Sequence, residues 1–142
     1  MLLSLPEPKD FTAATLQFRP VPGNPLANTE KMLELIDKAC NKAAVEGIQL
    51  NLVILPELST TGIIFDRQEA EKCSEEISGP IISSFIQKAK EKNIFIVLGM
   101  AERQAGKFFN TAVLIDPDGV RGTYRKVHLS SFDKKMGRCR RE

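Results

Sequence analysis

Short apolar runs alternate with amphipathic segments along the first hundred residues, and this alternation constrains the fold more than any other feature. Residues 50–55 and 94–98 are nearly continuous apolar runs. Runs of this length are typical of strands that are buried on both faces of a parallel sheet. Residues 32–43 and 81–89 repeat apolar side chains at three- and four-residue spacing, which predicts helices with one apolar face. The alternation of predicted strands and helices along the chain indicates an α/β layered sheet with a parallel core.

Further elements extend this pattern at both ends. Residues 12–18 predict a first strand, and residues 110–115 and 120–125 predict two more strands. The last two are separated by Asp-Pro-Asp-Gly at 116–119, a strong turn signal, so they are expected to form a hairpin. The hairpin would add an antiparallel margin to the parallel core.

Capping residues suggest where the helices begin. Asn28 or Thr29 is expected to cap the first long helix, with Glu30 in its first turn. Pro80, after Gly79, is expected in the first turn of the second long helix, where proline is favoured. A charged stretch at 67–73 predicts a short helix between them.

Length and composition describe one globular domain. The chain has 142 residues, of which 42% are hydrophobic and 27% charged. Its longest apolar stretch, residues 94–101, is too short to span a bilayer, so no membrane association is expected. Residues 1–6 have neither a basic segment nor a long apolar core, which disfavours a signal peptide and predicts a cytoplasmic location.

Charge and cysteine usage exclude several classes of protein. Residues 1–132 carry 15 basic and 16 acidic groups, and five basic residues fall in the segment 133–142. Residues 1–132 are nearly neutral and so lack the basic surface that nucleic-acid binding requires. The basic residues of the segment 133–142 are explained by a solvated tail. Three widely spaced cysteines form no disulfide framework, and a single histidine, His128, provides no zinc-like ligand cluster.

Two charged residues follow predicted strands and are candidates for chemistry. Glu57 closes the run at 52–57, and Lys126 closes the run at 120–126. Ligands of open α/β sheets bind at the carboxyl ends of strands, where a carboxylate and an ammonium could act as general base and oxyanion stabiliser. The alternatives are a capping or solvated acid at Glu57 and a basic edge strand at Lys126. His128 shares the face of Lys126 by alternation, and a hydrogen-bonded structural role is favoured for it.

Several short segments together carry a family resemblance. In order along the chain they are Leu-Gln-Phe-Arg-Pro at 16–20, Gly-Asn-Pro at 23–25, Asn28, Leu-Val-Ile-Leu-Pro-Glu-Leu-Ser-Thr-Thr-Gly at 52–62, Gly-Pro at 79–80, Val-Leu-Gly-Met-Ala-Glu-Arg at 97–103, Phe-Asn-Thr-Ala-Val at 109–113, Pro-Asp-Gly at 117–119 and Tyr-Arg-Lys-Val-His-Leu at 124–129. The chain resembles the first half of a nitrilase-type carbon–nitrogen hydrolase. The resemblance divides it into an N-terminal segment (1–10), a partial hydrolase domain (11–132) and an atypical basic tail (133–142).

The resemblance implies a fold and a mechanism. The fold is an α-β-β-α sandwich, of which about the first half is present. The mechanism is a Glu–Lys–Cys triad in which Glu57 is the general base and Lys126 stabilises the oxyanion, with a thioester intermediate. The implied substrates are small amides, nitriles or carbamoyl compounds, and no metal or organic cofactor is implied.

The nucleophile is the point of departure from the family. The family's cysteine lies in the second half, on a strand-to-turn elbow. Cys139 has flanking arginines but no preceding strand, so it is not a credible nucleophile. Cys40 lies on a helix's apolar face and Cys73 in a charged stretch, and structural or incidental roles are expected for both. The family's second glutamate, which positions the lysine, is matched only poorly by Asp133.

Two hypotheses follow from this departure. In the first, the chain derives from an amide- or nitrile-cleaving hydrolase and lacks turnover as it stands. In the second, it is a non-catalytic half-domain that binds or complements a partner chain. Half a sandwich exposes apolar sheet surface, so oligomers or aggregation are expected. A doubly wound nucleotide binder is disfavoured, because no Gly-x-Gly-x-x-Gly turn follows the first strand.

Overall fold

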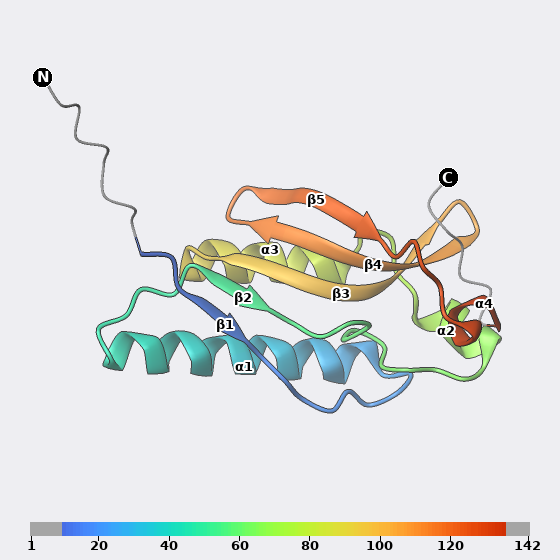
Figure 1. Ribbon diagram of the computed structural model, residues 1–142, viewed down its shortest axis with the longest axis horizontal. Helices are drawn as coiled ribbons and strands as arrows, with labels where there is room; N and C mark the ends of the chain where they lie inside the picture. The colour runs from blue at the N-terminus through green and yellow to red at the C-terminus, as the bar shows by residue number, and fades with distance from the viewer. Residues whose placement is uncertain (1–9, 136–142) are drawn as a thin grey trace, which may run out of the picture.

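The computed structural model describes residues 10–135, which form one mixed sheet and its helices (Figure 1). The elements are, in chain order, β1 (Ala13–Thr15), α1 (Pro25–Val45), β2 (Leu52–Ile54), α2 (Arg67–Cys73), α3 (Pro80–Lys92), β3 (Phe95–Gln104), β4 (Lys107–Asp116), β5 (Gly119–Arg125) and α4 (Ser131–Lys135). None of the helices in this part of the chain combines the length and the apolar character needed to cross a bilayer.

The strands follow one another across the sheet in the order β1-β2-β3-β4-β5. Parallel pairing joins β1 to β2 and β2 to β3, and antiparallel pairing joins β3 to β4 and β4 to β5. The parallel core and its antiparallel margin are therefore as predicted. Because the direction reverses twice after β3, β5 runs the same way as β2. The carboxyl ends of β2 and β5 consequently lie at the same edge of the sheet.

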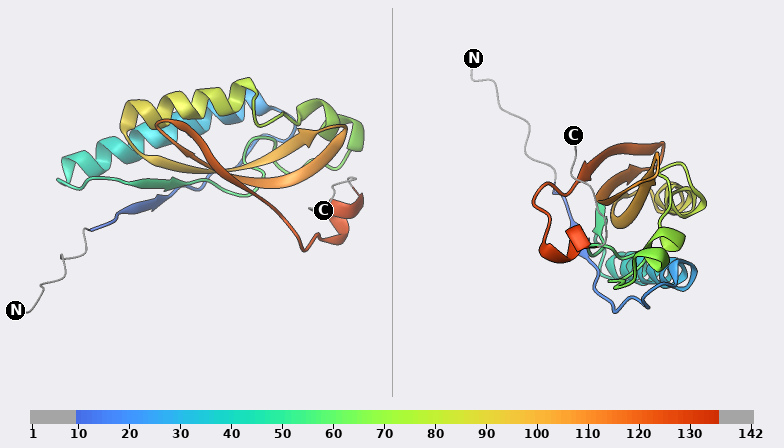
Figure 2. Two further views of the ribbon diagram at one scale, coloured as in Figure 1. Left: turned by 90° about the horizontal axis from the view of Figure 1, so that it is seen from above. Right: turned by 90° about the vertical axis from the view of Figure 1, so that its right-hand side faces the viewer.

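The two long helices, α1 and α3, lie side by side on one face of the sheet (Figure 2). The core fills the space between these helices and the sheet with side chains that include Met32, Ile36, Val53, Ile82, Phe85, Ile96, Leu98, Met100, Val113 and Ile115. Strand alternation sends every second side chain into this core. One helical layer thus covers one sheet, and the expected α/β fold is confirmed.

The other face of the sheet carries apolar side chains that this helical layer does not cover. Phe95 and Leu114 are 40% and 37% exposed, although both lie in the middle strands of the sheet. Leu52, Ile54 and Val97 on the same face are half-buried. We call this face, defined by these five residues, the open face.

The first long helix begins earlier than predicted. Asn24 caps it by accepting a hydrogen bond from the Ala27 N–H at 3.1 Å, and Pro25 occupies the first turn. Asn28 and Thr29, the two predicted caps, are 1% and 6% exposed and lie about one turn inside the helix. The Asn28 amide binds loop backbone instead, as described below. The Gly-Asn-Pro segment fits both a loop and a cap followed by proline, and the second interpretation is correct.

Strands β3 and β4 are longer than their apolar runs predict. Each has ten residues, and together they form a hairpin that turns at Ala105 and Gly106, both with positive φ (49° and 72°). The added residues include polar side chains such as Glu102 and Thr111, which are buried at 2% and 1% exposure. Apolar periodicity does not detect such residues, because they are buried through hydrogen bonds and ion pairs. The short helix α4 was also not predicted.

Candidate active site

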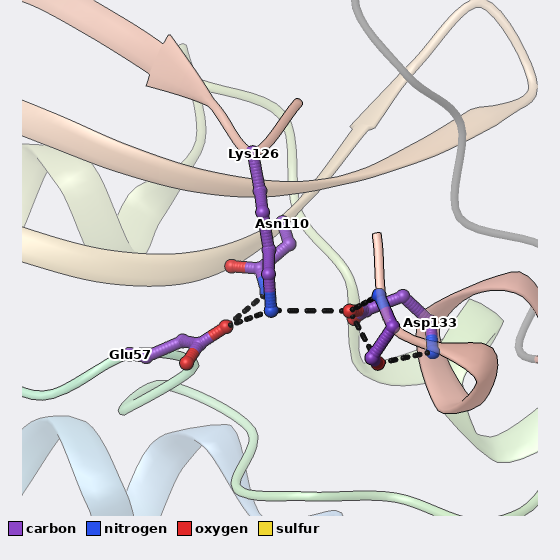
Figure 3. Close-up of polar contacts among 5 residues, drawn as sticks. Glu57, Asn110, Lys126 and Asp133 are labelled. Carbon is purple, nitrogen blue, oxygen red and sulfur yellow. Dashed lines mark hydrogen bonds and ion pairs between the residues drawn. The ribbon is translucent and has the colours of Figure 1, made fainter. Parts of the chain in front are cut away.

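Glu57 and Lys126, the two predicted site residues, meet at the carboxyl edge of the sheet (Figure 3). The Lys126 Nζ lies 2.9 Å from Glu57 Oε1 and 3.1 Å from Asp133 Oδ2. The Asn110 side-chain amide donates a second hydrogen bond to Glu57 Oε1, at 2.6 Å. The ammonium group therefore lies between two carboxylates, and an amide fixes one of them.

Glu57 reaches Lys126 because the loop after β2 crosses β3 on the open face. A Cβ added to Gly99 of β3 would lie 2.2 Å from Pro56 O and 2.8 Å from Glu57 Cα. Only glycine permits an approach this close, since the atoms in contact belong to the backbone. Two strands separate β2 from β5, so this crossing is what brings the carboxylate within reach of the ammonium.

The loop that carries Glu57, residues 56–62, is held in place by buried polar contacts. Ser59, Thr60 and Thr61 are all at most 1% exposed. The Ser59 hydroxyl donates to Gly99 O at 2.9 Å, and the Gly23 N–H donates to Thr61 O at 3.0 Å. The Thr60 hydroxyl has no hydrogen-bond partner among the described residues. The buried groups that are hydrogen-bonded make the loop rigid.

Asn28 connects this loop to the loop before α1. Its amide donates to Thr60 O at 3.0 Å and to Val21 O at 2.8 Å, while its carbonyl oxygen accepts from the Val21 N–H at 2.7 Å. One buried side chain thus satisfies three backbone groups in two loops. The position of Glu57 depends on these contacts as well as on Gly99.

Lys126 follows directly after β5, and backbone pairing fixes where its side chain emerges. The Lys126 N–H donates to Asn110 O at 2.8 Å, which continues the β4–β5 pairing by one residue. Alternation then directs Lys126 and Asn110 to one side of the sheet, and Arg125 and Thr111 to the other. Lys126 and Asn110 therefore reach Glu57 together.

Asp133 reaches the site through α4. Its carboxylate accepts hydrogen bonds from the Ser130 N–H at 3.1 Å and the Ser130 hydroxyl at 2.7 Å. In return, Ser130 Oγ accepts a hydrogen bond from the Asp133 N–H at 3.1 Å, so the pair caps the helix reciprocally. The Asp133 side chain is only 3% exposed, whereas that of Glu57 is 60% exposed.

The pKa values of the three groups reflect this arrangement. The hydrogen bond from Lys126, helped by that from Asn110, lowers the pKa of Glu57. The hydrogen bond to Glu57, followed by that to Asp133, raises the pKa of Lys126. Burial opposes ionisation of Asp133, but hydrogen bonds from Ser130 and Lys126 hold its pKa at about 2. At neutral pH the site thus contains two carboxylates and one ammonium.

A cavity of about 320 Å³ borders these groups, within the size range of small-molecule sites. Its lining comprises Leu55, Glu57, Val97, Gly99, Asn110, Thr111, Ala112, Tyr124 and Lys126. Apart from Glu57, Lys126 and a few polar neighbours, the walls are apolar.

The other sequence candidates lie elsewhere. Cys40 is on α1 and packs against the core, and the Cys73 thiol at the end of α2 donates to Gly23 O at 3.4 Å. Burial raises the pKa of both thiols, and neither lines the cavity. His128 is exposed on the loop after β5 and is not bonded to Lys126. Cys139 falls outside the described residues. Within residues 10–135 no group of three histidine, cysteine or acidic side chains is arranged to hold a metal ion.

The sequence alone indicates no role for Asn110, and it makes Asp133 a poor match for the family's second glutamate. Asn110 belongs to the Phe-Asn-Thr segment at the start of a predicted strand. A polar amide within that largely apolar run is the signal that could have indicated its role. Asp133 precedes two lysines and gives no pattern of its own. The Ser-x-x-Asp spacing from Ser130 is the signal that could have indicated a capped helix there.

Comparison with known proteins assigns the family. The family model described as carbon–nitrogen hydrolase matches residues 12–140, so the chain belongs to the carbon–nitrogen hydrolase family. A nitrilase from Pyrococcus abyssi is 34% identical over 123 residues, which are 85% of this chain and 45% of the relative. A formamidase from Bacillus cereus is 31% identical over 77% of this chain and 33% of the relative. The resemblance found in the sequence is confirmed.

Solved structures agree on the fold. A carbon–nitrogen hydrolase superfamily protein from Xanthomonas campestris, with an arsenic adduct in its active site, matches at a TM-score of 0.75 and 25% identity. That match covers 92% of this chain and 46% of the other. An N-terminal amidase matches at a TM-score of 0.80 and 19% identity, over 91% of this chain and 31% of the other. The chain therefore has the fold of an incomplete carbon–nitrogen hydrolase sandwich, and it spans less than half the length of these relatives.

Proposed function

We propose that this chain provides the general base and the oxyanion-stabilising lysine of a carbon–nitrogen hydrolase that acts on small amides, nitriles or carbamoyl compounds. The observation that carries the proposal is the 2.9 Å contact between Glu57 and Lys126 at the border of a cavity. Family membership supports the reaction class. The names of the relatives, a nitrilase, an amidase and a formamidase, support nitriles and amides as substrates.

The geometry suits the proposed chemistry. Glu57 is ionised, so it can accept the proton of an attacking thiol and later that of the hydrolytic water. Of the three N–H donors of Lys126, two serve Glu57 and Asp133 among the described residues, which leaves one for a developing oxyanion. In this proposal Asp133 and Asn110 position the charged pair without touching the substrate.

The nucleophile is proposed to come from outside residues 10–135. The two described cysteines have raised thiol pKa values and lie away from the cavity, so neither is a suitable attacking group. The 142-residue chain by itself is accordingly expected to lack turnover. On an amide, attack by a cysteine thiolate would break the C–N bond, form a thioester and release the amine, which takes up the proton held by Glu57. On a nitrile, attack would form a thioimidate, and one water would convert it to the thioester with release of ammonia. A further water would then hydrolyse the thioester to the acid and restore the thiol.

The test compares this chain alone with the chain joined to the remaining half of the Pyrococcus abyssi nitrilase. Simple amides and nitriles are supplied to both, and product formation is measured. The chain alone is expected to be inactive. The joined protein is expected to be active and to lose about 100-fold or more of its rate with Glu57→Gln. Glu30→Gln, an exposed position on α1, serves as the matched control. Hydrolysis by the chain alone that Cys139→Ser abolishes would contradict the proposal.

A second candidate function, a half-domain that complements a partner chain, is favoured by the open face. Phe95 and Leu114 expose apolar surface on the inner strands β3 and β4. Surfaces of this kind drive association. Sedimentation of the purified chain is expected to reveal oligomers, and a stable monomer would argue against this candidate.

A further inference from the structure

A buried ion pair lies behind the candidate site, on the helix-covered side of the sheet. Glu102 of β3 is 2% exposed, and its carboxylate is paired with the Arg125 guanidinium of β5. Arg125 Nε donates to Glu102 Oε2 at 2.9 Å, and Arg125 Nη2 donates to Oε1. The pairing is therefore bidentate, the geometry in which arginine fixes orientation as well as charge.

Further contacts attach this pair to β4. The Thr111 hydroxyl donates to Glu102 Oε2 at 2.6 Å. The Arg125 guanidinium lies over the ring of Phe109, with Cζ 3.8 Å from the ring centroid. Glu102 thus joins β3, β4 and β5 at one point.

Each contact of this cluster neighbours a site residue in the sequence. Arg125 immediately precedes Lys126, while Phe109 and Thr111 flank Asn110. Because alternate side chains of a strand point to opposite faces, fixing Arg125 and Thr111 on one side sets the direction of Lys126 and Asn110 on the other. The buried cluster and the Glu57 contacts therefore lie on opposite faces of the same stretches of β4 and β5.

Backbone pairing with β4 holds strand β5 along its length, and side-chain ion pairs add to it at Arg121 and Arg125. Strand β5 is an edge strand, and residues 120–124 are all exposed. Arg125 is its last residue and is half-buried, with 21% of the side chain exposed. The side chain that holds the end of β5 is therefore that of Arg125, one residue before the ammonium.

We propose that Glu102 is a positioning residue that, through Arg125 and Thr111, fixes Lys126 and Asn110 in contact with Glu57. Stability alone explains such a pair poorly, since apolar residues of similar volume often stabilise a core equally well or better. A bidentate charged pair does specify orientation. The consequence for catalysis depends on the proposed function, whereas the positioning itself can be measured without turnover.

The test measures the pKa of the Glu57 carboxyl by ¹³C NMR in the 142-residue chain. Arg125→Lys keeps the positive charge but removes the bidentate geometry and the flat contact with Phe109. Its expected effect is a rise in the Glu57 pKa, because Lys126 and Asn110 are no longer held against the carboxylate. Arg121→Lys is the matched control: the same change on the same strand, at a residue paired with Asp116 and Asp118 away from the site. That variant is expected to leave the Glu57 pKa unchanged.

Thr111→Val provides a second, milder variant in case Arg125→Lys does not fold. It removes the hydroxyl that binds Glu102, and a smaller rise in the Glu57 pKa is expected. A Glu57 pKa equal to that of the unmodified chain in Thr111→Val and in every folded Arg125→Lys sample would overturn the proposal. A rise in the pKa combined with inactivity of the joined hydrolase would leave the positioning role intact and refute the proposed function instead.

Discussion

Gly99 offers a direct test of how the fold delivers Glu57 to Lys126. The Gly99→Ala change places a methyl group 2.2 Å from Pro56 O and 2.9 Å from Leu58 N. Ordinary contacts begin near 3.4 Å, so the loop must move by about 1 Å. A shift of that size would break the 2.9 Å contact between Glu57 and Lys126 and weaken the bond from Ser59 to Gly99 O.

The loss of stability expected for Gly99→Ala follows from the kind of atoms that the new methyl group meets. Both are backbone atoms, so no side-chain rotation relieves the clash. Overpacking of this kind costs typically 1–3 kcal/mol, and we expect about 3 kcal/mol here. For a chain of this length that corresponds to a fall in melting temperature of roughly 10 °C. The Glu57 pKa is expected to rise at the same time, because the hydrogen bond from Lys126 that mainly lowers it is lost.

Circular dichroism melting of Gly99→Ala beside Gly122→Ala provides the measurement. Gly122 lies in β5, and a Cβ there would meet no atom within 4 Å. Alanine at that position is expected to be neutral or slightly stabilising, because it reduces the entropy of the unfolded chain. Equal melting temperatures for the two variants would refute the claim that the loop crosses β3 at Gly99.

Two more predictions concern groups that support the site. The pKa of Asp133 is lowered from 3.8 to about 2, so its carboxylate contributes stability above pH 4 that disappears as the pH falls toward 2. That contribution is about 2 kcal/mol. In Asp133→Asn, the free energy of unfolding should therefore fall less steeply between pH 4 and pH 2 than in the unmodified chain. An equally steep fall would contradict the lowered Asp133 pKa. Asn28→Ala leaves buried backbone groups of two loops unsatisfied and should cost about 3 kcal/mol in urea unfolding. Asn24→Ala removes only an exposed cap and should cost about 1 kcal/mol, so equal losses would contradict the buried role of Asn28.

The sequence predicted those parts of the fold that depend on local periodicity. The apolar faces that contain Met32 and Phe85 predicted the two long helices, and the run around Val53 predicted a buried strand. The sequence places the start of α1 four or five residues late, at Asn28 or Thr29. Asn24 is an equally acceptable cap, and only the folded structure shows that the Asn28 side chain binds the loops instead. The local preference for asparagine at a helix N-cap does not distinguish Asn24 from Asn28.

The candidate site was predictable where a residue type and a strand end coincide. Glu57 and Lys126 satisfy that condition, and the family resemblance paired them. The role of Asn110 depends on strand register, and that of Asp133 on a five-residue helix, neither of which the chain's apolar pattern encodes. The contact between Arg125 and Glu102 spans 23 residues and is likewise a product of register.

The most direct measurement of the central claim is the pKa of the Glu57 carboxyl, determined by ¹³C NMR in the unmodified chain and in Lys126→Met. We expect a value below the ordinary one near 4.3 in the unmodified chain and a clear rise in the variant, because the hydrogen bond from Lys126 is the largest cause of the lowered pKa. An ordinary pKa that the Lys126→Met change leaves unaltered would contradict the pairing on which the proposed function depends.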